Sequence, residues 1–322
     1  MKREDMHHYL LKVLEKKIPE KTKLVETLME ILFMERGAVY RRLRGEVPFS
    51  FYEMACIAEK LNISLNTFSD IDSVQKDRFE LNIIEYANMT DPDYKKWEDY
   101  ISLISLSKND PLSEMAESSN ILPLIIYGKF DLLTKYFLFK YQYQFNGTES
   151  RISFSNLVVP ERLRQLFRLY FRESKHFAKT ILIWDHLIFQ FLATEIKFFS
   201  SVNLISNDDI QSIGEELFAL LDYIEKITLH GCFEETGKPV SFYISDINLY
   251  ADYSYMKFND MRISLIRTLI LNSVTSTNQF SFGIIKNWIS ASKKSSTLIS
   301  QSAAIYRADF FEKQRKIISE LM

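Results

Sequence analysis

Four arginines stand close together in one short stretch of this sequence, and their chemistry is the first feature to explain. They are Arg36, Arg41, Arg42 and Arg44, and no acidic residue lies between the first and the last of them. A guanidinium group can donate two parallel hydrogen bonds to a phosphate, or to the O6 and N7 atoms of guanine. Because the whole chain carries a formal net charge of only −2, this is a local basic patch, which is compatible with binding nucleic-acid phosphates.

Residues of this kind need a short helix that is held rigidly by its neighbours. The spacing predicts that helix over residues 36–44, with Gly45 at its end, where the left-handed conformation is common. A helix opened by Pro19 or Thr22 precedes it, and a tight turn at residues 33–35 joins the two. Ser50, followed three residues later by Glu53, forms the pattern of a capping box and predicts the start of another helix.

Two further helices complete the predicted N-terminal bundle. One covers residues 3–17, and a short one begins near Ser64. The polar segment at residues 69–77 is interpreted as a linker. The sequence therefore predicts a domain at residues 1–72 and a larger domain at residues 73–322.

The segment LVETLMEILFMERGAVYRRLRGEVPFSFYEMACIAEKLNISLNTF resembles the helix-turn-helix domain of λ-repressor/Cro-type regulators over about residues 20–70. The resemblance includes the spacing of the parts and the ending IAEKLNISL. It implies a five-helix DNA-binding bundle whose third helix enters the major groove. Two positions depart from the family: Met29 stands where a small residue is frequent, and Phe33 stands where the turn usually has glycine.

The resemblance also implies which side chains face double-stranded DNA. They are Glu35, Arg36, Gly37, Tyr40, Arg41, Arg42 and Arg44. Arg36 and Arg41 are the candidates for reading base edges, whereas Arg42 and Arg44 are expected at phosphates. Gly37 would allow close approach, and Tyr40 would contact a phosphate or a thymine methyl group, or else have a structural role. The residues expected to be buried are Met34, Val39 and Leu43.

The remaining three quarters of the chain predict a fold class rather than an activity. Hydrophobic residues make up 47% of the sequence, while Gly and Pro are scarce at 8 and 7. This composition favours helices, which we expect near residues 91–106, 123–145, 160–177, 184–200, 208–228, 280–290 and 303–321. Residues 179–184 are ambiguous between strand and helix, and alternation over residues 240–253 predicts one or two strands. The predicted fold class is mainly α, with a small β element in the α-rich C-terminal domain.

Other chemistry-bearing groups have less specific interpretations. Asp185 beside His186 could do acid–base chemistry or form a satisfied polar pair. Arg164, Arg168 and Arg172 could bind an anion or form a solvated helix face. The aromatic run KYFLFKYQYQF is interpreted as core, with a pocket as the alternative. Two further hypotheses are a pocket at residues 243–258 and an interface on the aromatic helices. We expect no metal site, because the five histidines are scattered, and no nucleotide-phosphate loop.

These observations predict a cytoplasmic, bacterial-type transcriptional regulator rather than an enzyme. Double-stranded DNA is the expected partner, and no cofactor is expected. The C-terminal domain is expected to form a homodimer, to sense an unidentified small-molecule or peptide effector, or both. The most apolar long stretch, at residues 180–199, contains charged residues, so no membrane partner is expected. The alternative is a scaffold or antitoxin-like protein that uses the bundle to bind another protein.

Overall fold

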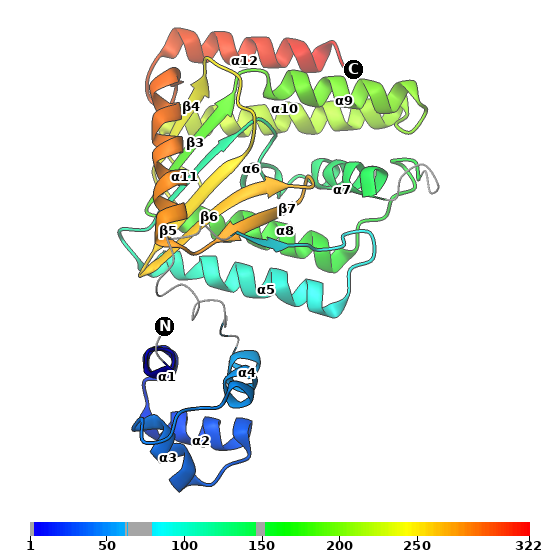
Figure 1. Cartoon of the computed structure of the whole chain (residues 1–322). Helices are drawn as coiled ribbons and strands as arrows, with labels where there is room; N and C mark the ends of the chain where they lie inside the picture. The colour runs from blue at the N-terminus through cyan, green and yellow to red at the C-terminus, as the bar shows by residue number, and fades with distance from the viewer. Residues whose placement is uncertain (1–2, 62, 64–78, 146–151) are drawn as a thin grey trace. The chain divides into compact units, whose positions relative to one another are not determined.

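The structure is a computed structural model, and it describes residues 3–61, 63, 79–145 and 152–322. The chain divides into two compact units, Met1–Asp77 and Arg78–Met322. Figure 1 shows both units, with helices and strands labelled.

The N-terminal unit is a small helical bundle. Its described helices are α1 (Arg3–Lys17), α2 (Lys21–Leu32), α3 (Arg36–Leu43) and α4 (Phe51–Lys60). Leu10 and Leu14 of α1 pack with Leu24, Val25, Leu28, Val39 and Ile57 in one apolar core. The predictions for these four helices and for the capping box of Ser50 and Glu53 are confirmed. The predicted fifth helix and the predicted linker lie outside the described residues.

The C-terminal unit contains a mixed sheet of eight strands in the order β1-β7-β6-β5-β2-β3-β4-β8, counted over the described residues. The strands are β1 (Glu80–Asn82), β2 (Glu114–Ser119), β3 (Lys179–Asp185), β4 (Val240–Ser245), β5 (Tyr253–Phe258), β6 (Met261–Thr268), β7 (Asn272–Ser276) and β8 (Ser296–Leu298). Strands β2, β3 and β4 are parallel, and the other neighbours are antiparallel. The prediction of a mainly α protein is therefore wrong, and the fold class is α/β.

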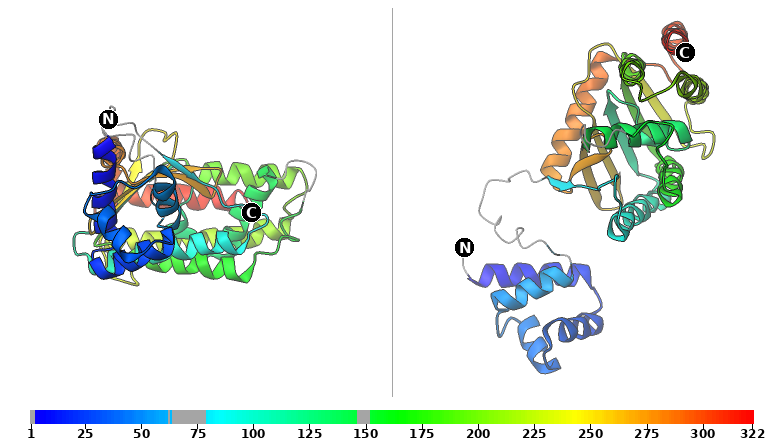
Figure 2. Two further views of the ribbon diagram at one scale, coloured as in Figure 1. Left: turned by 60° about the horizontal axis from the view of Figure 1, so that its bottom comes forward. Right: turned by 90° about the vertical axis from the view of Figure 1, so that its right-hand side faces the viewer.

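Helices cover the two faces of this sheet unequally (Figure 2). One face carries α5 (Asp91–Ser105), α6 (Leu124–Tyr127), α7 (Asp131–Phe145), α8 (Glu161–Glu173), α9 (Ile188–Ser201), α10 (Asn207–His230) and α12 (Ala304–Ser319). The other face carries α11 (Gln279–Ser292), which packs on β2, β5 and β6. Short 3₁₀ helices lie at Leu106–Asn109, Ser174–His176 and Lys293–Ser295 (η2, η3 and η4). The larger core lies on the face with many helices.

Strand β2 is the strand that is hardest to predict from the sequence, because its residues are Glu-Met-Ala-Glu-Ser-Ser. This segment has no apolar run and no alternation, although it pairs with β3 on one side and β5 on the other. Two of its polar side chains are buried with partners from distant parts of the chain: Glu117 accepts from Arg267 of β6, and the Ser119 hydroxyl donates to Asp252 in the loop before β5. Those partners are only known once the chain is folded, so the sequence pattern does not indicate a strand at this segment.

Some predicted boundaries also change. Trp184 and Asp185 end strand β3, so the helix expected from residue 184 begins only at Ile188. Leu249 and Ala251 lie in the loop before β5 rather than in a strand. The helix expected over residues 123–145 is split into α6 and α7 around Gly128. A Cβ at Gly128 would lie 3.0 Å from the carbonyl oxygen of Phe167, so the close approach of α8 requires glycine there.

No helix among the described residues is long and apolar enough to cross a bilayer.

Candidate nucleic-acid interface

Helix α3 turns a basic face to solvent. The side chains of Arg36, Arg41 and Arg44 are 55%, 62% and 62% exposed. Tyr40 and Gly37 are exposed on the same helix, and the space around Gly37 is open. Because residues four apart lie on one side of a helix, these five positions form one continuous stripe.

The opposite face of α3 anchors the helix to the bundle. Val39 is fully buried among leucines of α1 and α2, and Met34 and Leu43 pack partly against the same core. Burial of the Val39 side chain contributes roughly 1.5–3 kcal/mol to this attachment. The short helix is therefore held in place by packing and not by its own propensity.

The turn between α2 and α3 is closed by Phe33 in the left-handed conformation, with φ of 50°. Its backbone N–H donates to the carbonyl of Met29, and so does the N–H of Met34, at 3.3 Å. The Phe33 ring is 95% exposed. The departure from glycine at this position therefore leaves the backbone in the conformation that glycine favours.

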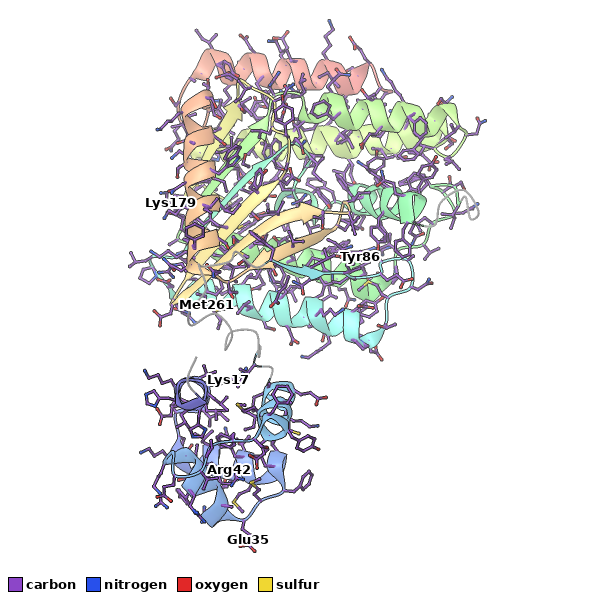
Figure 3. All side chains as sticks on the ribbon, viewed as in Figure 1. Lys17, Glu35, Arg42, Tyr86, Lys179 and Met261 are labelled. Carbon is purple, nitrogen blue, oxygen red and sulfur yellow. The ribbon has the colours of Figure 1, made fainter. Side chains whose placement is uncertain are left out.

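Arg42 differs from its three neighbours because its guanidinium group joins α3 to α4. Its Nη2 atom lies 2.7 Å from Oε1 of Glu53, its Nε atom donates to Oε2 at 3.2 Å, and its side chain is only 17% exposed. Glu53 also accepts from the backbone of Ser50 at the start of α4. In Figure 3, Glu35 lies at the outer end of α3, whereas Arg42 lies among side chains inside the bundle.

The electrostatics of Glu53 fit this structural role. Burial would raise the pKa of Glu53, but the hydrogen bonds from Arg42 and Ser50 outweigh it and hold the pKa below its ordinary value. The carboxylate is therefore charged and fully engaged within the bundle. The guanidinium group of Arg42 is held by Glu53 and is therefore not free to make the phosphate contact expected for it. The guanidinium groups of Arg36, Arg41 and Arg44 remain exposed to solvent.

A buried histidine ties α1 to the end of α3. The Nε2 atom of His7 lies 3.0 Å from the carbonyl oxygen of Arg42, and its Nδ1 atom accepts from the backbone N–H of Phe49 at 3.2 Å. His7 is 8% exposed and its ring lies against that of Phe49. The sequence pattern missed this role, because no local spacing links residue 7 to residues 42 and 49.

The exposed arginines have only weak internal partners. Arg36 lies 3.9 Å from Glu26, while Arg41 and Arg44 share Glu46 at 3.8 and 2.8 Å. Ion pairs this exposed contribute about 0–1 kcal/mol. A phosphate or a guanine edge can therefore replace these carboxylates at little cost.

A groove of about 310 Å³ lies on another side of the bundle, between the turn and α4. Its lining includes Phe33, Met34, Tyr52 and Cys56. The side chains of Phe33 and Tyr52 are 95% and 77% exposed, and Phe51 beside them is 75% exposed. Polar and charged residues also line this groove, namely Ser50, Glu53, Glu59 and Lys60, and it was not predicted from the sequence.

The other sequence candidates have structural partners within the C-terminal unit. Asp185 is fully buried, and its carboxylate accepts from the backbone N–H groups of Leu187 and Leu249 at 2.8 and 2.6 Å. Nδ1 of His186 lies 3.1 Å from the carbonyl oxygen of Ser245. Asp185 and His186 are therefore satisfied polar groups that hold loops at the end of the sheet.

The arginine row on α8 also has carboxylate partners. Arg164 pairs with Glu161 at 2.8 Å, Arg168 with Asp131 at 2.7 Å, and Arg172 with Glu173 at 3.2 Å. The aromatic run in α7 buries Tyr136, Phe137, Phe139 and Tyr141 in the main core. The core interpretation of this run is confirmed, and these side chains form no external interface.

Two buried charged clusters in the C-terminal unit were also missed. Arg267 lies 2.8 Å from Glu117 and 3.5 Å from Asp252. Burial raises the pKa of Glu117 to about 7, although Arg267 acts in the opposite direction. The three residues lie in distant parts of the chain, so no local sequence motif predicts this cluster.

The second cluster surrounds Lys175, whose side chain is 1% exposed. Its Nζ atom lies 2.7 Å from Glu235 and donates to the hydroxyl of Tyr223, and it also contacts the ring of Phe171. Burial lowers the pKa of Lys175 to about 7, against the effect of Glu235. Because the ammonium group is enclosed on all sides, it is a core group and not an accessible nucleophile.

Among the described residues, no group of three or more His, Cys, Asp or Glu side chains is arranged to hold a metal ion. Comparisons of the chain with protein-family models, with curated proteins and with solved structures found no match.

Proposed function

We propose that this protein is a sequence-specific DNA-binding transcriptional regulator that places α3 in the major groove. The observation that carries the proposal is the stripe of exposed residues on α3, with three arginines free of strong partners. A helix fits the major groove of B-DNA, and guanidinium groups recognise guanine bidentately. The resemblance of residues 20–70 to λ-repressor/Cro-type regulators supports the same assignment.

Individual roles follow from position on the stripe. Arg36 and Arg41 are assigned to base edges, and Arg44 to a phosphate. Gly37 allows the helix to approach the groove closely, and the hydroxyl of Tyr40 can bond a phosphate. Arg42 is left out, because Glu53 already holds its guanidinium group. Glu35 lies at the start of α3, where its carboxylate can accept from a cytosine amino group.

The C-terminal unit is assigned to dimerisation, to sensing an effector, or to both. A two-fold dimer would present two copies of α3 about one turn of DNA apart, roughly 34 Å. Such a regulator would act in the cytoplasm on a palindromic site. Its effector would be a small molecule or a peptide.

The test begins with the purified full-length chain and a random-sequence duplex library. We expect enrichment of one sequence, bound with a steep salt dependence of about −0.9 in log–log slope for each neutralised phosphate. Arg41→Ala should weaken binding to the enriched duplex by roughly 1–3 kcal/mol, measured by fluorescence anisotropy. Arg168→Ala, which removes an exposed arginine of α8, is the matched control and should leave affinity unchanged. A salt slope near zero, or equal affinities for Arg41→Ala and the unmodified chain, would contradict the proposal.

A second candidate function is a protein-interaction module, of the scaffold or antitoxin-like kind. The groove bordered by the exposed Phe33 and Tyr52 rings favours it, because exposed aromatic side chains are frequent at protein interfaces. This alternative expects a bound protein partner and no enriched duplex in the same selection.

A further inference from the structure

Helix α11 is apolar on two faces, although the sheet covers only one of them. Phe282, Ile285 and Ile289 are at most 5% exposed and pack with side chains of β2, β3 and β5. Phe280, Ile284 and Trp288 are 46%, 46% and 57% exposed. These three residues are spaced four apart, so they form a single stripe along the helix. The stripe ends at the margin of the sheet, because the Trp288 ring also lies 6.0 Å from the ring of Tyr253 in β5. We call this stripe the outer face of α11.

The outer face also lacks charge. The exposed residues of α11 are Gln279, Phe280, Ile284, Asn287, Trp288, Ser290 and Ala291. Lys286 is the only charged residue of the helix, and its Nζ atom lies on the sheet side, 3.6 Å from the carboxylate of Glu114. A solvated helix face normally carries charged side chains, so an uncharged face with three large apolar groups marks a contact surface.

Two properties of this face select its occupant. A charged partner, such as a nucleic acid or a charged peptide, would find no complementary charge on it. Two identical uncharged faces, in contrast, meet without repulsion between like charges. The order aromatic, aliphatic, aromatic along the stripe is close to symmetric about Ile284, and a two-fold interface requires a surface that is complementary to itself.

We propose that the outer face of α11 packs against the same face of a second copy of this chain. The two helices would run antiparallel about a two-fold axis at Ile284. Four residues correspond to about 6 Å along a helix, so Phe280 of one copy would meet Trp288 of the other. A Cβ at Gly283 would meet no atom within 4 Å, which leaves room at the centre for the facing helix.

The size of the contact sets its strength. One pair of helices covers less than the roughly 800 Å² per partner of a standard interface, so we expect dissociation in about the micromolar range. The role of this dimer, which is to pair two DNA-binding units, rests on the proposed function. The contact itself does not, because oligomeric state is measured without DNA. A dimer without DNA binding would overturn only the proposed function, and DNA binding by a monomer would overturn only this inference.

The first experiment is sedimentation equilibrium of the full-length chain, whose monomer mass is 38.0 kDa, over roughly 1–100 μM. We expect a monomer–dimer equilibrium that Ile284→Lys weakens at least about tenfold, because the axis would bring two lysines together. Ile305→Lys, at an 82% exposed position on α12, is the matched control and should dimerise like the unmodified chain. A monomer at every concentration, or equal dimerisation of Ile284→Lys and the unmodified chain, would overturn the proposal.

A second experiment tests the axis with variants that keep the face apolar. In a background in which Cys56 and Cys232 are replaced by serine, Ile284→Cys should form a disulfide-linked dimer on mild oxidation. Phe280→Cys alone should not form this disulfide, because the cysteines at position 280 of the two copies would lie about 12 Å apart along the helices, beyond the reach of a disulfide. Mixing Phe280→Cys with Trp288→Cys should restore cross-linking. Equal cross-linking of all three single variants, or of none, would overturn the antiparallel arrangement.

Discussion

At the scale of single residues, Phe33 bears on the stability of the N-terminal unit. For a residue with a side chain, a positive φ is unfavourable by on the order of 1 kcal/mol. Because the Phe33 ring is exposed, its packing offsets little of this strain energy. Phe33→Gly should therefore stabilise the unit by roughly 0.5–1 kcal/mol. Native-state hydrogen exchange of α2 and α4 amides in the full-length chain would measure this change. Slower exchange supports the strain argument, and faster exchange would mean that the ring stabilises the groove that it borders.

At the scale of elements, the contact between α3 and α4 depends on Arg42. Removing its guanidinium group leaves the buried carboxylate of Glu53 without its main partner, so Arg42→Ala should destabilise the N-terminal unit by roughly 1–3 kcal/mol. Arg44→Ala is the matched control, because the pair of Arg44 with Glu46 is exposed and its loss should change stability by less than about 0.5 kcal/mol.

Arg42→Ala and Arg44→Ala should also differ in how their DNA affinity relates to their stability. Arg44→Ala is expected to weaken binding with little change in stability, since the role proposed for Arg44 is a phosphate contact. Hydrogen exchange together with anisotropy titrations on the same samples distinguishes the two effects. If Arg42→Ala left exchange rates unchanged while it abolished binding, the structural assignment of Arg42 would fail.

At the scale of the whole molecule, Glu117 connects the middle of the sheet to the main core. Its folded-state pKa of about 7 exceeds the ordinary value of 4.5, so the folded protein retains a proton that the unfolded chain releases. The free energy of unfolding should therefore fall as pH rises from about 4.5 to 7, by on the order of 1–3 kcal/mol from this group. Glu117→Gln should remove that part of the fall.

The measurement is urea denaturation of the full-length chain at several pH values between 5 and 8. The variant should gain stability relative to the unmodified protein as pH rises through this window. Glu161→Gln, at an exposed carboxylate on α8, is the control and should follow the unmodified curve. Parallel curves for Glu117→Gln and the unmodified chain would show that Arg267 keeps Glu117 ionised throughout.

Local patterns in the sequence determined the N-terminal helices and the exposed stripe of α3. Capping by Ser50, the left-handed Gly45 and the apolar spacing around Val39 all act within a few residues, so they can be read along the chain. The same holds for the strand at residues 240–245, whose apolar residues alternate, whereas the apolar run at residues 179–184 fitted a strand or a helix and only the sheet decided it.

Only the tertiary structure decided the fold class, the role of Arg42 and which side of α11 packs on the sheet. The sequence of strand β2 is polar, and the partners of its buried Glu117 and Ser119 lie 130 or more residues away in the chain. The sequence does not distinguish Arg42 from Arg41, and only the packing of α4, which places Glu53 beside Arg42, gives Arg42 its structural role. In α11, apolar residues lie on both faces, and the sequence alone does not say which of the two packs on the sheet. Contacts between distant segments determine these outcomes, and such contacts leave no periodic signal in the chain.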